Sequence, residues 1–232
     1  MRWSSVVYGS RSISNWRRYR FTRLQSSSIM DRRLGDDIVR MGDLLPYKLW
    51  HNPLARDQLT LREVYDSMSR VGADAQEIPL MIQLVENPRY RIPGFTVFHG
   101  AVDLEQHDCI HIVLGRGLLE MDEAFTIGFT MGSTKKVTTT EEQLFSLVSQ
   151  YLYPKVYQFG EQEIAVFKDA VRLGYVSGCA ALDEVDFKKY FDLSLRAARE
   201  EIGLEVNLLR AYYEIENKRY PDSTASQRLL DS

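Results

Sequence analysis

The sequence predicts an all-α protein with a single helical domain. Three observations carry this prediction. Apolar residues recur at three- and four-residue spacing, glycine and proline stand where helices should end, and no long stretch alternates apolar and polar residues as a strand would. The chain has 232 residues, of which 44% are hydrophobic, so it can bury one core of ordinary size. Its net charge of -3 provides no broad basic surface, and we expect no nucleic-acid partner.

The N-terminal segment differs from the rest of the chain in composition. Residues 1–30 contain six arginines, eight serines and no acidic residue, which is typical of transit peptides and of helices on a membrane surface. We therefore expect residues 1–33 to form a basic arm or a membrane-contacting segment, with a mitochondrial presequence as the competing interpretation. No apolar run reaches the roughly 20 residues that span a bilayer, so we expect any membrane attachment to be peripheral.

Helix signals follow one another along the remaining chain. Asp103 with Gln106, and Thr139 with Glu142, are spaced as capping boxes at two helix starts, while glycine or proline marks most of the expected ends. The expected helices cover residues 57–72, 104–114, 118–131, 139–153, 161–173 and 187–202.

The expected helical domain covers residues 34–205 and is followed by a C-terminal extension over residues 206–232. Within the domain, residues 78–86 form a further apolar run. The end of the extension, from residue 221 onward, is expected to be a frayed tail.

The segment His107-Asp108-Cys109-Ile110-His111 is the cluster that most suggests chemistry. On the expected helix, His107 and His111 share one face, and Asp108 lies about 100° around the axis from His107. These three side chains can converge on one point. Cys109 projects to the opposite side and is interpreted as a core residue.

Glu123 can join this cluster only if the chain reverses direction. On one continuous helix the sixteen positions from His107 to Glu123 would separate them by roughly 24 Å. Gly115 and Gly117 provide the turn that folds the second helix back on the first. That helix is apolar nearly all round and therefore buried, and a carboxylate buried in it needs a partner such as a cation.

The predicted site is thus a metal site on a helix-turn-helix hairpin, with His107, Asp108, His111 and Glu123 as ligands. Two imidazoles with one or two carboxylates suit zinc, iron, manganese or cobalt. Glu120 is expected at the rim of the site or behind the ligands. No catalytic residue is expected beyond the ligands themselves.

Two other classes of metalloenzyme fit the pattern less well. Zinc peptidases carry a glutamate beside the first histidine as general base, and here Asp108 is one methylene shorter. A His-Asp phosphohydrolase needs a separate upstream histidine and a downstream aspartate at spacings that this sequence lacks.

The run from His107 to Gly117, followed by Glu123, closely resembles the signature of the coenzyme Q biosynthesis protein 4 family: His-Asp, two residues, His, eleven residues, Glu. A fainter likeness continues through residues 183–204, and the resemblance covers roughly residues 40–205. Three features depart from the family pattern. The stretch between Ile92-Pro93-Gly94 and the motif is shorter than in typical members. Asp122 stands where a glycine is usual, and residues 205–232 extend past the usual end.

The resemblance implies an all-helical fold, a divalent metal ion held by the four predicted ligands and a pocket for a polyprenyl chain. Zinc is the first candidate for the metal, with iron, manganese, cobalt and magnesium as alternatives. The implied function is a metal-dependent step of prenylquinone (ubiquinone-type) biosynthesis, in which the ring of a prenylated hydroxybenzoate is decarboxylated and hydroxylated at C1. The alternative is a non-catalytic scaffold that binds a prenyl lipid and organises other quinone-biosynthesis enzymes.

The resemblance also implies where the protein works and with what. The expected location is a membrane surface, on the cytoplasmic side in a bacterium or on the matrix side of the mitochondrial inner membrane in a eukaryote. The expected partners are a prenylated quinone precursor or prenyl lipid, a second copy of the chain, and a quinone-biosynthesis complex.

The basic arm generates a first prediction. We expect the full chain to bind weakly to vesicles that contain anionic lipid, through Trp16, Tyr19, Phe21 and the neighbouring arginines. Deleting residues 1–30 should reduce the fraction that cosediments with anionic vesicles. Undiminished association after the deletion would contradict the assignment.

Overall fold

The computed structural model describes residues 49–70, 99–100, 102–152 and 158–230, all within one compact unit. This part of the chain is helical and contains no β-strand, so the all-α prediction is confirmed. Its α-helices are α2 (Leu61–Arg70), α4 (Leu104–Leu114), α5 (Glu120–Ser133), α6 (Thr139–Leu147), α7 (Glu161–Val176), α8 (Leu195–Ile202), α9 (Val206–Arg219) and α10 (Thr224–Gln227). A π-helical turn, Val148–Leu152, follows α6, and two 3-10 turns, Leu182–Glu184 and Phe187–Tyr190, lie between α7 and α8.

The predicted arm over residues 1–33 and the apolar run over residues 78–86 lie outside the described residues. Within the described ones, no helix combines the length and the apolar character that crossing a membrane requires.

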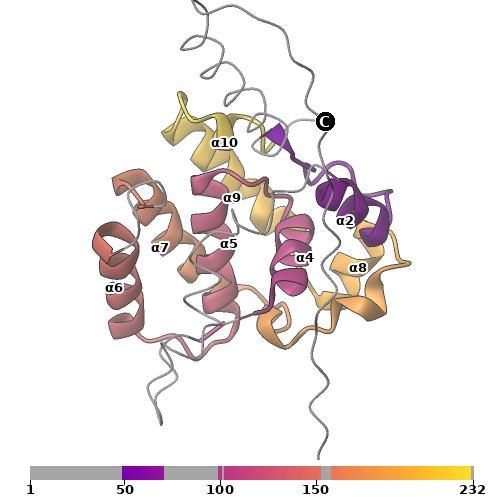
Figure 1. Ribbon diagram of the computed structural model, residues 1–232, viewed down its shortest axis with the longest axis horizontal. Helices are drawn as coiled ribbons and strands as arrows, with labels where there is room; N and C mark the ends of the chain where they lie inside the picture. The colour runs from indigo at the N-terminus through magenta and orange to yellow at the C-terminus, as the bar shows by residue number, and fades with distance from the viewer. Residues whose placement is uncertain (1–48, 71–98, 101, 153–157, 231–232) are drawn as a thin grey trace, which may run out of the picture. The chain divides into compact units, whose positions relative to one another are not determined.

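Helices α4 and α5 form the predicted hairpin, and Figure 1 shows α5 between α4 and α7. Both predicted ends of α4 are confirmed. The Asp103 carboxylate accepts a hydrogen bond from the Gln106 backbone N–H, and Gly115 ends the helix in the left-handed conformation with φ 70°. A Cβ atom on Gly115 would lie 2.8 Å from the Leu54 side chain, so both backbone conformation and space require glycine here.

Helices α5 and α7 approach each other closely enough to exclude side chains. A Cβ atom on Gly132 would lie 2.1 Å from the Val171 carbonyl oxygen, and one on Gly174 would lie 2.3 Å from the Phe129 carbonyl oxygen. Helix α5 ends at Ser133, close to the predicted end near Gly132, whereas α7 was predicted to be closed by Gly174 and continues to Val176. The predicted end of α7 is wrong because Gly174 allows close helix packing there and does not end the helix.

Two other helix starts and one capping box differ from prediction for local reasons, while α6 begins at Thr139 as predicted. Helix α2 begins at Leu61 because Thr60 and Glu63 form its capping box. The capping box of α6 is Thr138 with Glu141, one residue earlier than predicted. The helix expected from residue 187 is a 3-10 turn, and α8 begins only after Ser194, whose side chain accepts from the Ala197 N–H.

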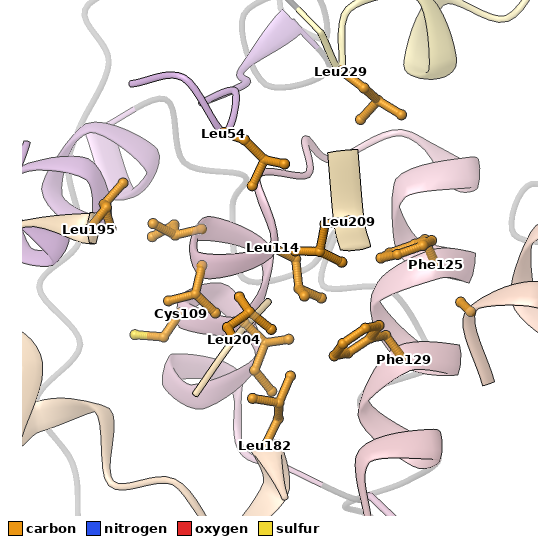
Figure 2. Close-up of a cluster of buried hydrophobic side chains, with 14 of the residues drawn as sticks. Leu54, Cys109, Leu114, Phe125, Phe129, Leu182, Leu195, Leu204, Leu209 and Leu229 are labelled. Carbon is orange, nitrogen blue, oxygen red and sulfur yellow. The ribbon is translucent and has the colours of Figure 1, made fainter. Parts of the chain in front are cut away.

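The C-terminal segment is part of the core. Leu209 and Tyr213 of α9, and Leu229 after α10, are buried in the main hydrophobic cluster. Figure 2 shows Phe125 and Phe129 of α5 pointing toward the region where Leu114 of α4 and Leu209 lie. The expectation of a frayed tail is therefore wrong for residues 221–230.

The α5–α7 contact generates a second prediction. Gly132→Ala should lower the free energy of unfolding by about 1–3 kcal/mol, because the new methyl group meets a backbone oxygen. This clash outweighs the roughly 1 kcal/mol that alanine gains over glycine in a helix. Urea denaturation of the purified protein measures the change.

Gly178→Ala is the matched control. Gly178 is exposed, and the nearest atom to an added Cβ lies 4.0 Å away, so its stability should stay within about 0.5 kcal/mol of the wild-type value. Equal stability of the two variants would contradict the close packing of α5 on α7.

Candidate metal centre

The hairpin brings three of the four predicted ligands together. Glu123 Oε2 lies 3.3 Å from His107 Nε2 and 3.4 Å from His111 Nε2. The two imidazole rings meet nearly edge to face, with centroids 4.5 Å apart and an interplanar angle of 66°. All three residues are buried, with relative exposures of 6% for His107, 0% for His111 and 8% for Glu123. The turn at Gly115 therefore places Glu123 level with the histidines, as predicted.

These three side chains could hold a metal ion. Within the residues that the structure describes, His107 Nε2, His111 Nε2 and Glu123 Oε2 have no hydrogen-bond partner, although buried polar atoms are normally paired. Ligand atoms about 2.0–2.1 Å from a tetrahedral zinc ion lie about 3.3–3.4 Å from one another. The two observed nitrogen–oxygen separations fit that value, so a cation would satisfy all three atoms at once.

The charges of His107 and Glu123 depend on each other. Burial lowers the pKa of His107, but the neighbouring Glu123 carboxylate outweighs it and raises this pKa to about 9. Burial raises the pKa of Glu123, but His111 and His107 outweigh it and hold this pKa well below its usual range. A carboxylate and a protonated imidazole thus stabilise each other, and a bound cation would replace that proton.

Asp108 lies beside this group and not within it. Its Oδ1 is 3.9 Å from His107 Nδ1, the ring nitrogen that does not contact Glu123, and its side chain is 22% exposed. The physical reason is its position one residue after His107, about 100° around the helix. Asp108 as a fourth ligand stays a prediction. Glu120, at the first position of α5 and half-buried, is also outside the group of three.

Sequence reasoning missed a buried arginine in the turn. The Arg116 guanidinium is fully buried between two aromatic rings, 3.7 Å from the Phe125 centroid and 4.3 Å from the Tyr213 centroid. It donates two hydrogen bonds to the Glu216 carboxylate, at 2.9 and 2.6 Å. The ion pair and the ring contacts together offset the desolvation of the charge. A basic residue between two glycines in a buried turn was the available signal.

A second buried arginine, Arg199 of α8, was also missed. It holds the C-terminal end of α4, whose last four carbonyl groups have no partner within the helix. The available signal was its position on the same helix face as Leu195 and Ile202. The hydrogen bonds at this helix end are Arg199 Nε to Val113 O (2.9 Å), Arg199 Nη2 to Ile112 O (3.4 Å), Tyr213 Oη to Leu114 O (2.7 Å) and Arg116 N to His111 O (2.9 Å).

The opposite end of the hairpin forms hydrogen bonds with residues 182–185, which include the 3-10 turn Leu182–Glu184. Gln106 of α4 donates to the carbonyl oxygens of Leu182, Asp183 and Val185, at 3.1, 2.9 and 3.2 Å. Ser133 of α5 accepts from the Leu182 backbone N–H at 3.0 Å. Both ends of the hairpin are therefore fixed, with the three donor atoms between them.

Asp122 of α5 contacts the C-terminal segment through Arg228. Asp122 is fully buried and accepts hydrogen bonds from the Leu119 backbone N–H and from Arg228. A side chain on Gly117 would occupy the space of the Arg228 guanidinium. The C-terminal segment therefore packs against the turn that precedes Glu123.

Comparison of the chain with models of protein families, with curated proteins and with solved structures finds no match. The case for the site therefore rests on the geometry of its own residues.

The group of three generates a third prediction. Glu123→Gln keeps the shape of the side chain but removes its charge, so zinc affinity should fall by at least the roughly 10–100-fold that loss of an outer partner of a metal ligand causes. Competition against a chromophoric chelator measures the affinity.

Glu120→Gln is the matched control, because it makes the same chemical change three residues earlier and outside the group. Its zinc affinity should stay within about threefold of the wild-type value, which is less than 1 kcal/mol. Equal losses in the two variants would mean that zinc responds to the general charge of α5 and not to a ligand.

Proposed function

We propose that this chain is a peripheral membrane, metal-dependent protein of prenylquinone biosynthesis that acts on the ring of a prenylated hydroxybenzoate. One observation carries the proposal: three buried donor atoms, which have no hydrogen-bond partner among the described residues, converge in the order and spacing of the His-Asp-x-x-His…Glu signature. Zinc is the first candidate for the metal. The bacterial cytoplasmic membrane face and the mitochondrial matrix face are the proposed locations, and a homodimer within a quinone-biosynthesis complex is the proposed assembly.

The ligand set favours a catalytic site over a closed structural one. Structural zinc sites use four protein ligands, whereas catalytic sites use three and keep a position for water or substrate. His107, His111 and Glu123 are three such ligands, and two of them retain slight exposure. The partly exposed Asp108 carboxylate lies on the His107 side of the group, where it either completes the ligand set or faces an incoming substrate.

In the proposed reaction, the bond between ring carbon C1 and the carboxylate breaks, CO₂ leaves and a C–O bond forms at C1. Replacement of a carboxylate by a hydroxyl group removes two electrons from the substrate, and we propose dioxygen as the oxidant. In the balanced step, the ring carboxylic acid, one water and one O₂ give the hydroxylated ring, CO₂ and H₂O₂, with the hydroxyl oxygen supplied by water. A divalent cation supplies Lewis-acid stabilisation of negative charge on a substrate oxygen. The protein residues hold that cation, and the fixed hairpin keeps their atoms in place.

A non-catalytic scaffold that binds a prenyl lipid is the second candidate. The near-complete burial of the three ligands favours it, since none is more than 8% exposed and a ring substrate must reach them in order to react. A cation that only orients a lipid headgroup needs less access than one that takes part in turnover.

One assay distinguishes the two candidates and gives a fourth prediction. The purified full chain, reloaded with zinc and then separately with iron(II), manganese or cobalt, is given a prenylated 4-hydroxybenzoate labelled with ¹³C in its carboxyl group, in the presence of dioxygen. We expect labelled CO₂ and the hydroxylated ring, both detected by mass spectrometry. His111→Ala should abolish the turnover, while circular dichroism checks that the variant keeps its helices.

Each result has a defined meaning. Turnover lost in His111→Ala with binding of the prenylated substrate retained supports the enzyme. Binding without turnover in the wild-type chain supports the scaffold. Neither binding nor conversion with any of the metals would refute both forms of the proposal.

A further inference from the structure

A buried threonine on α5 lies against the ring of one predicted ligand. Thr126 Oγ1 is 3.3 Å from His111 Nδ1, and both residues are fully buried. Thr126 follows Glu123 by three positions, so it lies nearly one turn further along the same face of α5. One helix face thus presents both a ligand carboxylate and a hydroxyl group to the histidines of α4.

The tautomer of the imidazole ring decides which group donates the hydrogen bond in this contact. A neutral ring carries its proton on one nitrogen and a lone pair on the other. His111 Nε2 faces Glu123, so it can bind a cation only if the proton is on Nδ1. That N–H group then needs an acceptor. Since His111 is fully buried, bulk water does not supply one, and among the described residues Thr126 Oγ1 lies within hydrogen-bond distance.

The two histidines of the site differ in this respect. His107 Nδ1 lies 3.9 Å from Asp108 Oδ1, which is longer than a hydrogen bond. The Asp108 carboxylate is partly exposed. Water can therefore accept a hydrogen bond from the His107 Nδ1–H group on the outer side of the ring. His111 is fully buried, so water cannot replace the Thr126 hydroxyl group beside its ring in the same way.

We infer that Thr126 is a positioning residue. Its hydroxyl oxygen accepts a hydrogen bond from the His111 Nδ1–H group and so holds the Nε2 lone pair toward the metal. The inference rests on the proposed metal site and goes beyond it by naming what sets the tautomer and orientation of one ligand. A hydroxyl group suits this role because it can accept from the ring while its own proton bonds elsewhere.

The test compares zinc affinity in four purified full-length proteins, measured by chelator competition. Thr126→Val keeps the volume and removes the hydroxyl group, so zinc affinity should fall by about 10–100-fold. Thr126→Ser restores the hydroxyl group, and its affinity should return to within a few-fold of wild type. Thr126→Ala removes the hydroxyl group with a smaller side chain and should behave like the valine variant.

Thr130→Val is the matched control. Thr130 is buried one turn further along α5, and its hydroxyl group donates to the Thr126 carbonyl oxygen at 2.7 Å. This variant removes a buried hydroxyl group from the same helix without touching His111, so its zinc affinity should equal that of wild type. Thermal unfolding of each metal-free protein separates lost affinity from lost stability.

A spectroscopic readout addresses the ring itself. In zinc-loaded protein labelled with ¹⁵N-histidine, the Nδ1–H proton of His111 should give a resonance that exchanges slowly with solvent. The resonance should be lost or broadened in Thr126→Val and present in Thr126→Ser.

The outcomes separate this inference from the metal site on which it rests. If the wild-type protein binds none of the metals, the proposed site is wrong and the inference falls with it. If wild type binds zinc and Thr126→Val binds it equally well, the site stands and the role of Thr126 is refuted. Equal losses in Thr126→Val and Thr130→Val would refute the inference too, because they would assign the effect to packing of α5. A loss in Thr126→Val alone, reversed in Thr126→Ser, supports it.

Discussion

The satisfied C-terminal end of α4 is the constraint on which the rest of the site depends. A helix ends with four carbonyl groups that its own hydrogen bonds leave free, and here this end is buried. These carbonyl groups accept hydrogen bonds from backbone N–H groups of the turn, from the Arg199 guanidinium and from the Tyr213 hydroxyl group. Because the helix stops abruptly at Gly115, the chain can reverse within residues 115–119 and return along α4 as α5. The approach of Glu123 to His107 and His111 follows from that reversal.

Two buried charges support this turn, and each draws on a distant part of the chain. Arg116 lies in the turn itself, yet its carboxylate partner Glu216 belongs to α9. Asp122 lies in the first turn of α5, and its guanidinium partner Arg228 directly follows α10. A buried charge is tolerated only with a partner of opposite sign or equivalent hydrogen bonds. The C-terminal segment is therefore part of the structure that holds the site.

The same fixed hairpin explains why the three donor atoms remain together although they have no hydrogen-bond partner among the described residues. Unpaired buried polar atoms destabilise a fold, and a flexible pair of helices would separate to hydrate them. Gln106 and Ser133 fix one end of the hairpin through hydrogen bonds to residues 182–185. The buried Arg199 and Arg116 fix the other end. The arrangement is consistent with a preorganised site, in which the fold holds ligands ready for a cation. Because the site is buried, access of a substrate to the three ligand atoms is the property that distinguishes an enzyme from a protein that only binds a lipid.

The sequence by itself determined the helical class, the limits of α4 and the pairing of the two histidines with Glu123. These features depend on local geometry: helix periodicity, an aspartate cap, and a glycine that adopts a left-handed conformation. Only the tertiary structure decided the rest. It extended α7 through Gly174, buried the C-terminal segment, and placed Asp108 beside the ligand group. These outcomes depend on contacts between residues distant in sequence, because whether a glycine ends a helix or lets another approach is decided by its spatial neighbours.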